Sequence, residues 1–204
     1  MTNPVPLQYD CYYHIYNRGI NRENIFIDED NYLYFLKLLA KHVLPLADVY
    51  SYCLLRNHFH LLVRIKSEDE IQANLSNLQG QSSLPKPSQR FSNLFNAYAK
   101  AFNKRNKRTG SLFQRPFGRV EITKNTQLIH LVTYIHHNPE KHGLVSDFQD
   151  WRHSSFQGLV RMSGDTHLKR AEVLGWFGGL KGFELAHHQY DELREITYLI
   201  GEYE

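Results

Sequence analysis

Two histidines separated by one residue are the first candidates for chemistry in this chain. His58 and His60 lie within residues 49–65, where apolar and aromatic side chains predict two short strands with a break near Arg56 and Asn57. Because residues two apart on a strand point to the same side of a sheet, the two imidazoles share a face and could bind a metal ion. A bare pair of this kind is more often two half-buried, hydrogen-bonded histidines, so a metal site needs support from elsewhere in the sequence.

A predicted helix supplies the second group of candidates. Residues 126–138 contain Tyr134 and Asn138, which are four apart and therefore lie on one side of the helix, beside its apolar stripe. Two imidazoles and one amide oxygen can bind a divalent cation and leave positions open for phosphate oxygens. A phenol brought in line with that phosphate could act as a covalent nucleophile. The simpler interpretation of Tyr134 is an aromatic side chain at the core edge, and His130 and His137 are rival ligands to Asn138.

The basic residues are distributed unevenly along the sequence. No Asp or Glu occurs between Ile71 and Val120, a window that contains nine Lys or Arg residues. A block of one sign indicates a polyanionic partner, and we expect a nucleic acid. The residues expected to contact it are Asn17, Arg18, Arg56, Lys104, Arg105, Lys107, Arg108, Arg115 and Arg119. The alternative for the basic side chains is an ordinary solvated surface, and for Asn17 and Arg18 it is the end of a strand and a turn.

The order of predicted elements indicates how these groups are positioned. Strand-like and helix-like periodicities alternate along the first two thirds of the chain, and the order β-α-β-β-α-β-α is typical of an α+β, ferredoxin-like antiparallel sheet with helices on one face. The predicted segments are a strand at 12–18, a helix at 28–43, two strands within 49–65, a weak helix through 71–78, a loop at 79–89, a helix at 91–105, a strand at 116–122 and a helix that Asn125 or Thr126 caps and that ends at Asn138.

Four motifs, in their order along the chain, resemble those of the single-tyrosine transposases of the HUH superfamily. The matching segments are residues 13–19, 52–63, 110–115 and 134–139. The last two point to the branch called REP-associated tyrosine transposases, and the resemblance covers roughly residues 12–145. One departure is Arg56, which stands where these proteins usually have proline before Asn-His.

The resemblance implies a ferredoxin-like fold and a specific catalytic site. His58, His60 and Asn138 would be the ligands of Mg²⁺ or Mn²⁺. Tyr134 would be the nucleophile, and single-stranded DNA with a hairpin would be the substrate. The predicted function is a metal-dependent single-stranded DNA endonuclease and strand transferase, that is, a transposase with a covalent 5′-phosphotyrosine intermediate. The alternatives are a domesticated DNA-hairpin-binding protein that no longer cuts, and an HUH-type replication or conjugation nuclease.

The resemblance also divides the chain. Residues 1–145 are expected to form the catalytic domain and residues 146–204 a mostly helical C-terminal extension, which Trp151 and Trp176 should help to dock. This extension resembles the longer REP-associated branch and favours a monomer over a homodimer. The sequence has no apolar run long enough for a membrane span and no signal-peptide pattern, and its two cysteines do not form a metal-type pair. We therefore expect a cytoplasmic, nucleoid-associated protein without membrane contact.

Overall fold

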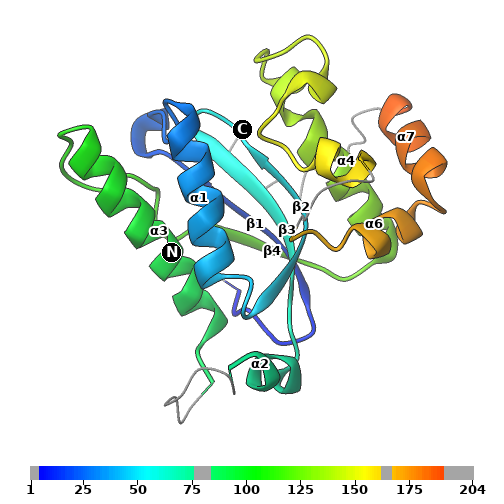
Figure 1. The fold of residues 1–204 in the computed structure, drawn as a ribbon, viewed down its shortest axis with the longest axis horizontal. Helices are drawn as coiled ribbons and strands as arrows, with labels where there is room; N and C mark the ends of the chain where they lie inside the picture. Colours follow the sequence, from blue (N-terminus) through cyan, green and yellow to red (C-terminus); the bar gives the residue numbers. More distant parts are fainter. Residues whose placement is uncertain (1–4, 76–83, 162–166, 191–204) are drawn as a thin grey trace.

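A four-stranded antiparallel sheet lies at the centre of the computed structural model, which describes residues 5–75, 84–161 and 167–190. The strands are β1 (Tyr12–Arg18), β2 (Ala47–Leu54), β3 (His58–Ile65) and β4 (Gly118–Ile122). Their order across the sheet is β2-β3-β1-β4 (Figure 1), so β1 is a central strand that pairs with β3 on one side and β4 on the other. This arrangement confirms the predicted α+β, ferredoxin-like architecture.

Helices cover both faces of the sheet. On one face, at the left of Figure 1, lie α1 (Glu29–His42) and α3 (Pro87–Arg105), and on the other lie α4 (Asn125–Lys141) and the C-terminal helices. The remaining helices are η1 (Ile20–Arg22), α2 (Glu68–Leu75), η2 (Phe148–Asp150), α5 (Phe156–Val160), α6 (Arg170–Trp176) and α7 (Leu180–His188). The helices predicted on one face of the sheet are α1 and α3. α4 and the C-terminal helices form a second layer on the other face. None of the helices in the described ranges combines the length and apolar character that crossing a membrane requires.

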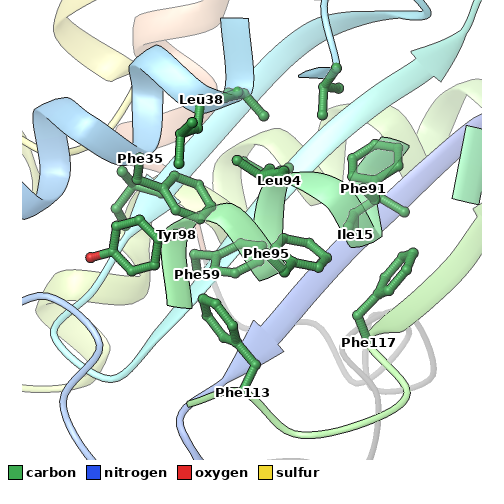
Figure 2. Close-up of a cluster of buried hydrophobic side chains, with 14 of the residues drawn as sticks. Ile15, Phe35, Leu38, Phe59, Phe91, Leu94, Phe95, Tyr98, Phe113 and Phe117 are labelled. Carbon is green, nitrogen blue, oxygen red and sulfur yellow. The ribbon is translucent and has the colours of Figure 1, made fainter. Parts of the chain in front are cut away.

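An aromatic cluster fills the space between the sheet and the first helical layer. Figure 2 shows Phe59 of β3 between Phe35 of α1 and Phe95 of α3, with ring centroids 5.0 and 5.5 Å from that of Phe59. Tyr98 of α3 belongs to the same cluster, and its hydroxyl donates a hydrogen bond to the Ile25 carbonyl. Burial of each such ring contributes about 1.5–3 kcal/mol to the free energy of folding. This layer therefore stabilises the sheet whose other face carries His58 and His60.

Strand alternation separates this core from the second layer. Ile15, Phe59 and Leu61 belong to the cluster beneath α1 and α3. His14 and His60, which alternate with them, lie on the face that α4 covers, where both imidazoles contact the ring of Tyr134. The prediction that His58 and His60 share one face while Phe59 enters the opposite layer is therefore confirmed.

The described part of α2 and the start of α3 differ from their predicted limits. α3 begins at Pro87, inside the segment predicted as a loop at 79–89. Proline is favoured in the first turn of a helix because its missing N–H would have no intrahelical partner there. α2 ends at Leu75, and the remainder of the weak helix predicted through residue 78 lies outside the described residues, as do residues 79–83 of the predicted loop.

α4 also differs from its predicted limits at both ends. Neither Asn125 nor Thr126 is the cap, because Lys124 is the capping residue and the Gln127 side chain accepts a hydrogen bond of 3.1 Å from its N–H. The helix continues through Pro139 to Lys141 instead of ending at Asn138. A proline so close to the end of a helix removes only one backbone hydrogen bond, so the last turn survives.

The C-terminal extension packs against the outer edge of β2 and against α4. The indole N–H of Trp151 donates to the Leu54 carbonyl at 3.0 Å, and Trp176 stacks on Tyr50 with ring centroids 5.0 Å apart. The predicted docking role of both tryptophans is thus confirmed. Residues of the extension also pair with β2, because the N–H of Leu54 donates to the His153 carbonyl and the N–H of Ser155 donates to the Tyr52 carbonyl.

Candidate active site

The turn that precedes His58 is tightly held by backbone hydrogen bonds. The N–H of Leu55 donates to the His58 carbonyl at 2.9 Å, and the N–H of Gly19 donates to the Asn57 carbonyl at 2.8 Å. The Arg56 carbonyl accepts from two further N–H groups, at 2.8 and 2.9 Å, while its side chain is exposed. The turn therefore forms with arginine at the position where the resembling proteins have proline.

Both imidazoles of the pair are oriented by a partner on their Nδ1 atom. His58 Nδ1 lies 2.6 Å from the Asn57 Oδ1, and His60 Nδ1 lies 2.9 Å from the Nε2 of His14 on β1. The Asn57 amide nitrogen donates to the Arg22 carbonyl, which leaves Oδ1 as the acceptor, so the proton of neutral His58 sits on Nδ1. Its Nε2 then carries the lone pair that a metal ion requires.

Three buried atoms near this point have no hydrogen-bond partner among the described residues. They are the Nε2 atoms of His58 and His60 and the Oδ1 of Asn138. A buried polar atom left unpaired costs about 1–3 kcal/mol, so three of them on the predicted ligands need an explanation. The described chain contains no set of three His, Cys, Asp or Glu side chains arranged for a metal, and the amide of Asn138 falls outside those residue types.

Burial determines the charge of the two histidines. Desolvation, helped by the nearby Arg18 cation, lowers the pKa of His58 to about 3. Desolvation also places the pKa of His60 well below its ordinary value, with a further contribution from His14. Both side chains are only 4% exposed. They are therefore neutral near pH 7, and the neutral imidazole is the form that binds metal ions.

Tyr134 lies beside the histidine pair. Its ring, 1% exposed, meets the His60 ring edge-on with centroids 5.6 Å apart, and the Lys141 ammonium lies 5.6 Å from the centroid of the phenol ring. One turn further along α4, the Asn138 amide donates to the Tyr134 carbonyl at 2.9 Å and is fully buried. The structure thus brings Tyr134 to the histidine pair and places Asn138 one turn further along α4. Both histidines belong to β3, and Tyr134 and Asn138 belong to α4.

The rival ligand His137 lies on a different part of α4. Its Nε2 lies 2.9 Å from the His187 carbonyl, and its ring stacks on Tyr190 with centroids 4.5 Å apart. It therefore contacts the C-terminal extension. His130 precedes Asn138 by about two helical turns.

Three side chains at this site were not singled out from the sequence as part of it. His14 and Asn57 orient the two imidazoles, and the His142 ring lies 4.8 Å from that of His58. Asn57 was visible as the neighbour of His58 in the motif. His14 could have been recognised only with the register between β1 and β3, and His142 only once α4 was known to extend past Pro139.

The residues predicted to contact DNA are distributed over both faces of the sheet. Arg18 pairs with His58 in the strand register, whereas Asn17 lines a pocket on the α3 side together with Arg115 and Arg119. Lys104 and Lys107 are exposed at and just beyond the end of α3, and Arg56 is exposed at the turn before β3.

Two of these predicted contacts are already paired within the chain. The Arg105 guanidinium forms ion pairs with Asp28 at 2.9 Å and Asp30 at 3.1 Å. Arg108 pairs with Glu23 at 2.6 Å. The sequence window has no acidic residue, but folding brings acids from residues 23–30 to its basic end. The uniform positive charge seen in the sequence is therefore reduced in the structure.

The fold and the facing histidine and tyrosine elements define the class of protein. Residues 7–138 match the family described as "Transposase IS200 like", and the chain belongs to this family. A Haemophilus influenzae protein named "Putative REP-associated tyrosine transposase" is 30% identical over 112 residues, which cover 53% of this chain and 58% of that relative. The chain thus aligns with little more than half the length of that curated relative.

A solved structure has a similar fold. It is described as "Structure of the REP associates tyrosine transposase bound to a REP hairpin". The TM-score is 0.55 at 18% sequence identity, and the match covers 81% of this chain and 92% of that chain. At this identity the likeness confirms the fold.

Proposed function

We propose that this protein is a metal-dependent single-stranded DNA endonuclease and strand transferase that uses Tyr134 as its nucleophile. The observation that carries the proposal is the set of three unpaired buried atoms on His58, His60 and Asn138, next to the Tyr134 ring. A protein that used these residues only for packing would gain stability by pairing or replacing them. Membership of the IS200-like transposase family supports the same reaction.

The donor atoms suit a divalent cation with open positions. The Nε2 atoms of His58 and His60 and the Oδ1 of Asn138 would hold Mg²⁺ or Mn²⁺. Because imidazole nitrogen is softer than the oxygen donors that Mg²⁺ prefers, we expect Mn²⁺ to bind more tightly. Once bound, the cation would polarise the scissile phosphate and stabilise charge on the leaving oxygen. The Nδ1–H of His60 would then donate a hydrogen bond to the Nε2 of His14, and this tautomer leaves the lone pair on the His60 Nε2.

In the proposed reaction, the Tyr134 oxygen attacks the phosphorus of a phosphodiester. A bond forms between this oxygen and phosphorus, the bond from phosphorus to the 3′ oxygen breaks, and the 3′ oxygen takes up a proton from water and leaves as a hydroxyl. The strand that starts at the phosphate remains attached as a 5′-phosphotyrosine, and attack by another 3′ hydroxyl would reverse the step and join strands. The phenol proton passes to water as the bond from oxygen to phosphorus forms.

The proposed substrate is a DNA hairpin with a single-stranded flank. The relative whose fold matches is described as bound to a REP hairpin, and we extend that substrate class to this chain. Exposed cations such as Lys104, Lys107 and Arg56 would bind phosphates, and Arg18 would bind the strand next to His58. We further propose that the protein acts as a monomer on DNA in the cytoplasm.

The test is covalent capture of labelled DNA. Hairpin oligonucleotides with single-stranded flanks are incubated with the protein and Mn²⁺, and the adduct is measured on denaturing gels. We expect an adduct from the parent protein and, because the nucleophile is missing, a loss of at least about 10³-fold in its rate of formation from Tyr134→Phe. The matched control is Tyr34→Phe, which removes the hydroxyl of a partly exposed tyrosine on the opposite helical layer and should leave the rate unchanged.

Two results would contradict this function. Equal adduct formation by Tyr134→Phe and the parent protein would mean that another group attacks. Tight hairpin binding with no cleavage in Mg²⁺, Mn²⁺ or another divalent cation would identify a DNA-binding protein that has lost the cutting reaction.

A further inference from the structure

A pocket lies on the face of the sheet opposite Tyr134. It has a volume of about 320 Å³ and opens between α3 and residues 110–117, and Asn17 of β1 and Arg119 of β4 close its floor. Phe95, Phe113 and Phe117, all labelled in Figure 2, contribute aromatic walls, and the Phe95 ring lies 5.5 Å from Phe113 and 5.2 Å from Phe117. The pocket has no acidic residue in its lining.

Arg119 is the charged group inside this pocket. Its guanidinium carbon lies 3.9 Å from the centre of the Phe117 ring, which holds the planar group against an aromatic face. Its Nε is buried and has no hydrogen-bond partner in the described part of the chain, and the guanidinium forms no ion pair there. Burial lowers its pKa, yet an arginine remains charged in proteins. A guanidinium whose buried Nε has no hydrogen-bond partner indicates an anionic or polar ligand.

The side-chain amides of Asn17 and Gln114 line the same pocket as the Arg119 guanidinium. The Asn17 Oδ1 accepts a hydrogen bond from the Arg18 N–H at 2.8 Å, which leaves its NH₂ group as a donor toward a ligand. The backbone N–H of Gln114 donates to the Arg18 carbonyl at 2.9 Å, and this bond holds Gln114 at the pocket wall. Its side-chain amide forms no hydrogen bond with any residue that the structure describes.

We propose that this pocket binds one unpaired nucleotide of the DNA, with the base against the aromatic walls and the phosphate on Arg119. The inference rests on the proposed function and assigns the substrate a contact outside the reacting centre. Aromatic rings and guanidinium planes bind the faces of unstacked bases, and amide groups bind their edges. Exposed Arg115 at the rim adds a second positive charge for the neighbouring phosphate.

The end of β1 connects this pocket to the candidate active site. Asn17 faces the pocket, and the next residue, Arg18, pairs with His58 in the strand register. A single strand that passes over this end of the sheet can therefore place one nucleotide in the pocket and a nearby phosphodiester beside Tyr134. The pocket would in this way set the distance between a recognised base and the cutting position.

The test couples base removal to removal of the pocket groups. Hairpin oligonucleotides carry a short single-stranded flank in which each nucleotide in turn is replaced by an abasic site, and binding is measured for the parent protein, Arg119→Gln and Gln114→Ala. We expect one flank position at which base removal weakens parent binding by at least about fivefold, the lower limit for one lost base–aromatic contact. At that position the same removal should cost Gln114→Ala clearly less than it costs the parent protein, because the edge contact of the base is already lost. Arg119→Gln should weaken binding of the intact and the abasic oligonucleotide alike, because the abasic site keeps the phosphate that Arg119 would bind. Lys100→Gln, an exposed cation of α3 outside the pocket, should behave as the parent protein.

A direct measurement protects the test against a misfolded variant. The parent protein is irradiated with an oligonucleotide that carries 5-iodouracil at the sensitive position, and the crosslinked peptide is mapped. A crosslink within residues 91–119 or at Asn17 supports the pocket, and a crosslink elsewhere overturns it. A scan with no sensitive position, or equal losses in the parent protein and Gln114→Ala, overturns the pocket even if the Tyr134 adduct forms. Coupling without any adduct retains the pocket and overturns only the cutting reaction, and failure of every flanked hairpin to bind overturns both.

Discussion

At the scale of single residues, His58 and His60 differ from the histidines that serve the fold. His136 is also fully buried, but both of its nitrogens have partners, the His187 Nε2 at 2.8 Å and the Ser155 hydroxyl at 2.7 Å. His58 and His60 have a partner only on Nδ1, and their Nε2 atoms are left unpaired beside Tyr134. This one-sided pairing, which burial alone does not require, supports the proposed role of His58 and His60 as metal ligands.

The Asn57 side chain gives a prediction at this scale. Asn57→Ala removes the acceptor of the His58 Nδ1 proton, so the imidazole loses its fixed tautomer and orientation. We expect Mn²⁺ affinity, measured by titration calorimetry, to fall by about 10- to 100-fold, as for other outer partners of metal ligands. Asn57→Asp keeps an acceptor oxygen and should restore most of the affinity. Unchanged binding by the alanine variant would show that the amide does not position His58.

At the scale of elements, the sequence predicted most strands and helices because their periodic residues face cores on both sides of the sheet. β1 has the predicted limits, and the helix of Tyr134 and Asn138 was recognised from spacing alone. The contact between His14 and His60 could not be predicted in the same way, because it depends on a strand register across 46 residues of sequence. The acids that neutralise Arg105 and Arg108 were missed for the same reason, since they come from distant segments.

Gly118 at the start of β4 gives a prediction for packing between strands. A Cβ on this residue would lie 2.1 Å from the Tyr16 ring, whose face covers the glycine. Gly118→Ala must therefore displace Tyr16, which neighbours His14 and His60, and should lower the free energy of unfolding by about 1–3 kcal/mol. Urea unfolding measures this loss.

Gly175 in α6 is the matched control for this substitution. A Cβ there meets nothing within 4 Å, so Gly175→Ala should be neutral or stabilise by up to about 1 kcal/mol. If the two alanine variants had equal stability, the close approach of Tyr16 to β4 would be excluded.

At the scale of the whole molecule, the extension is joined to the sheet through buried histidines. The Nδ1–H of His187 in α7 donates to the Phe183 carbonyl at 2.8 Å, so its Nε2 accepts a hydrogen bond of 2.8 Å from the Nδ1–H of His136 in α4. The His187 ring is packed among Phe156, Phe177 and Phe183. The second hydrophobic cluster therefore continues from the sheet and α4 into the described part of the extension, residues 146–161 and 167–190.

This junction gives a prediction about pH. Burial lowers the pKa of His187 to about 3, with smaller contributions from His137 and His188, whereas the unfolded value is about 6.5. The unfolded chain therefore binds one more proton between these values, and stability is retained above pH 6.5 and lost as pH falls below it. The loss at pH 5 amounts to about 2 kcal/mol for this residue. His187→Gln should reduce the difference in unfolding free energy between pH 7 and pH 5 by about that amount.

The neighbouring His188 provides the control for this measurement. Its side chain is exposed and contributes only a little to the low pKa of His187, so His188→Gln should change the pH dependence of unfolding much less than His187→Gln does. An identical pH dependence in His187→Gln and the parent protein would mean that the imidazole is hydrated or protonated in the folded state.

The pairing of the extension with β2 has a consequence for self-association. Unpaired peptide groups at the edge of a sheet can pair with strands of other molecules, and proteins generally cover such edges to prevent aggregation. Here the carbonyl of Tyr52 and the N–H of Leu54 are already engaged by residues 153–155, and the Val49 carbonyl by Lys169. A second copy therefore cannot lengthen the sheet across β2, and any pairing of chains through strands is confined to the margin formed by β4. Truncation after Val145 would expose the edge of β2 and should promote aggregation of the protein.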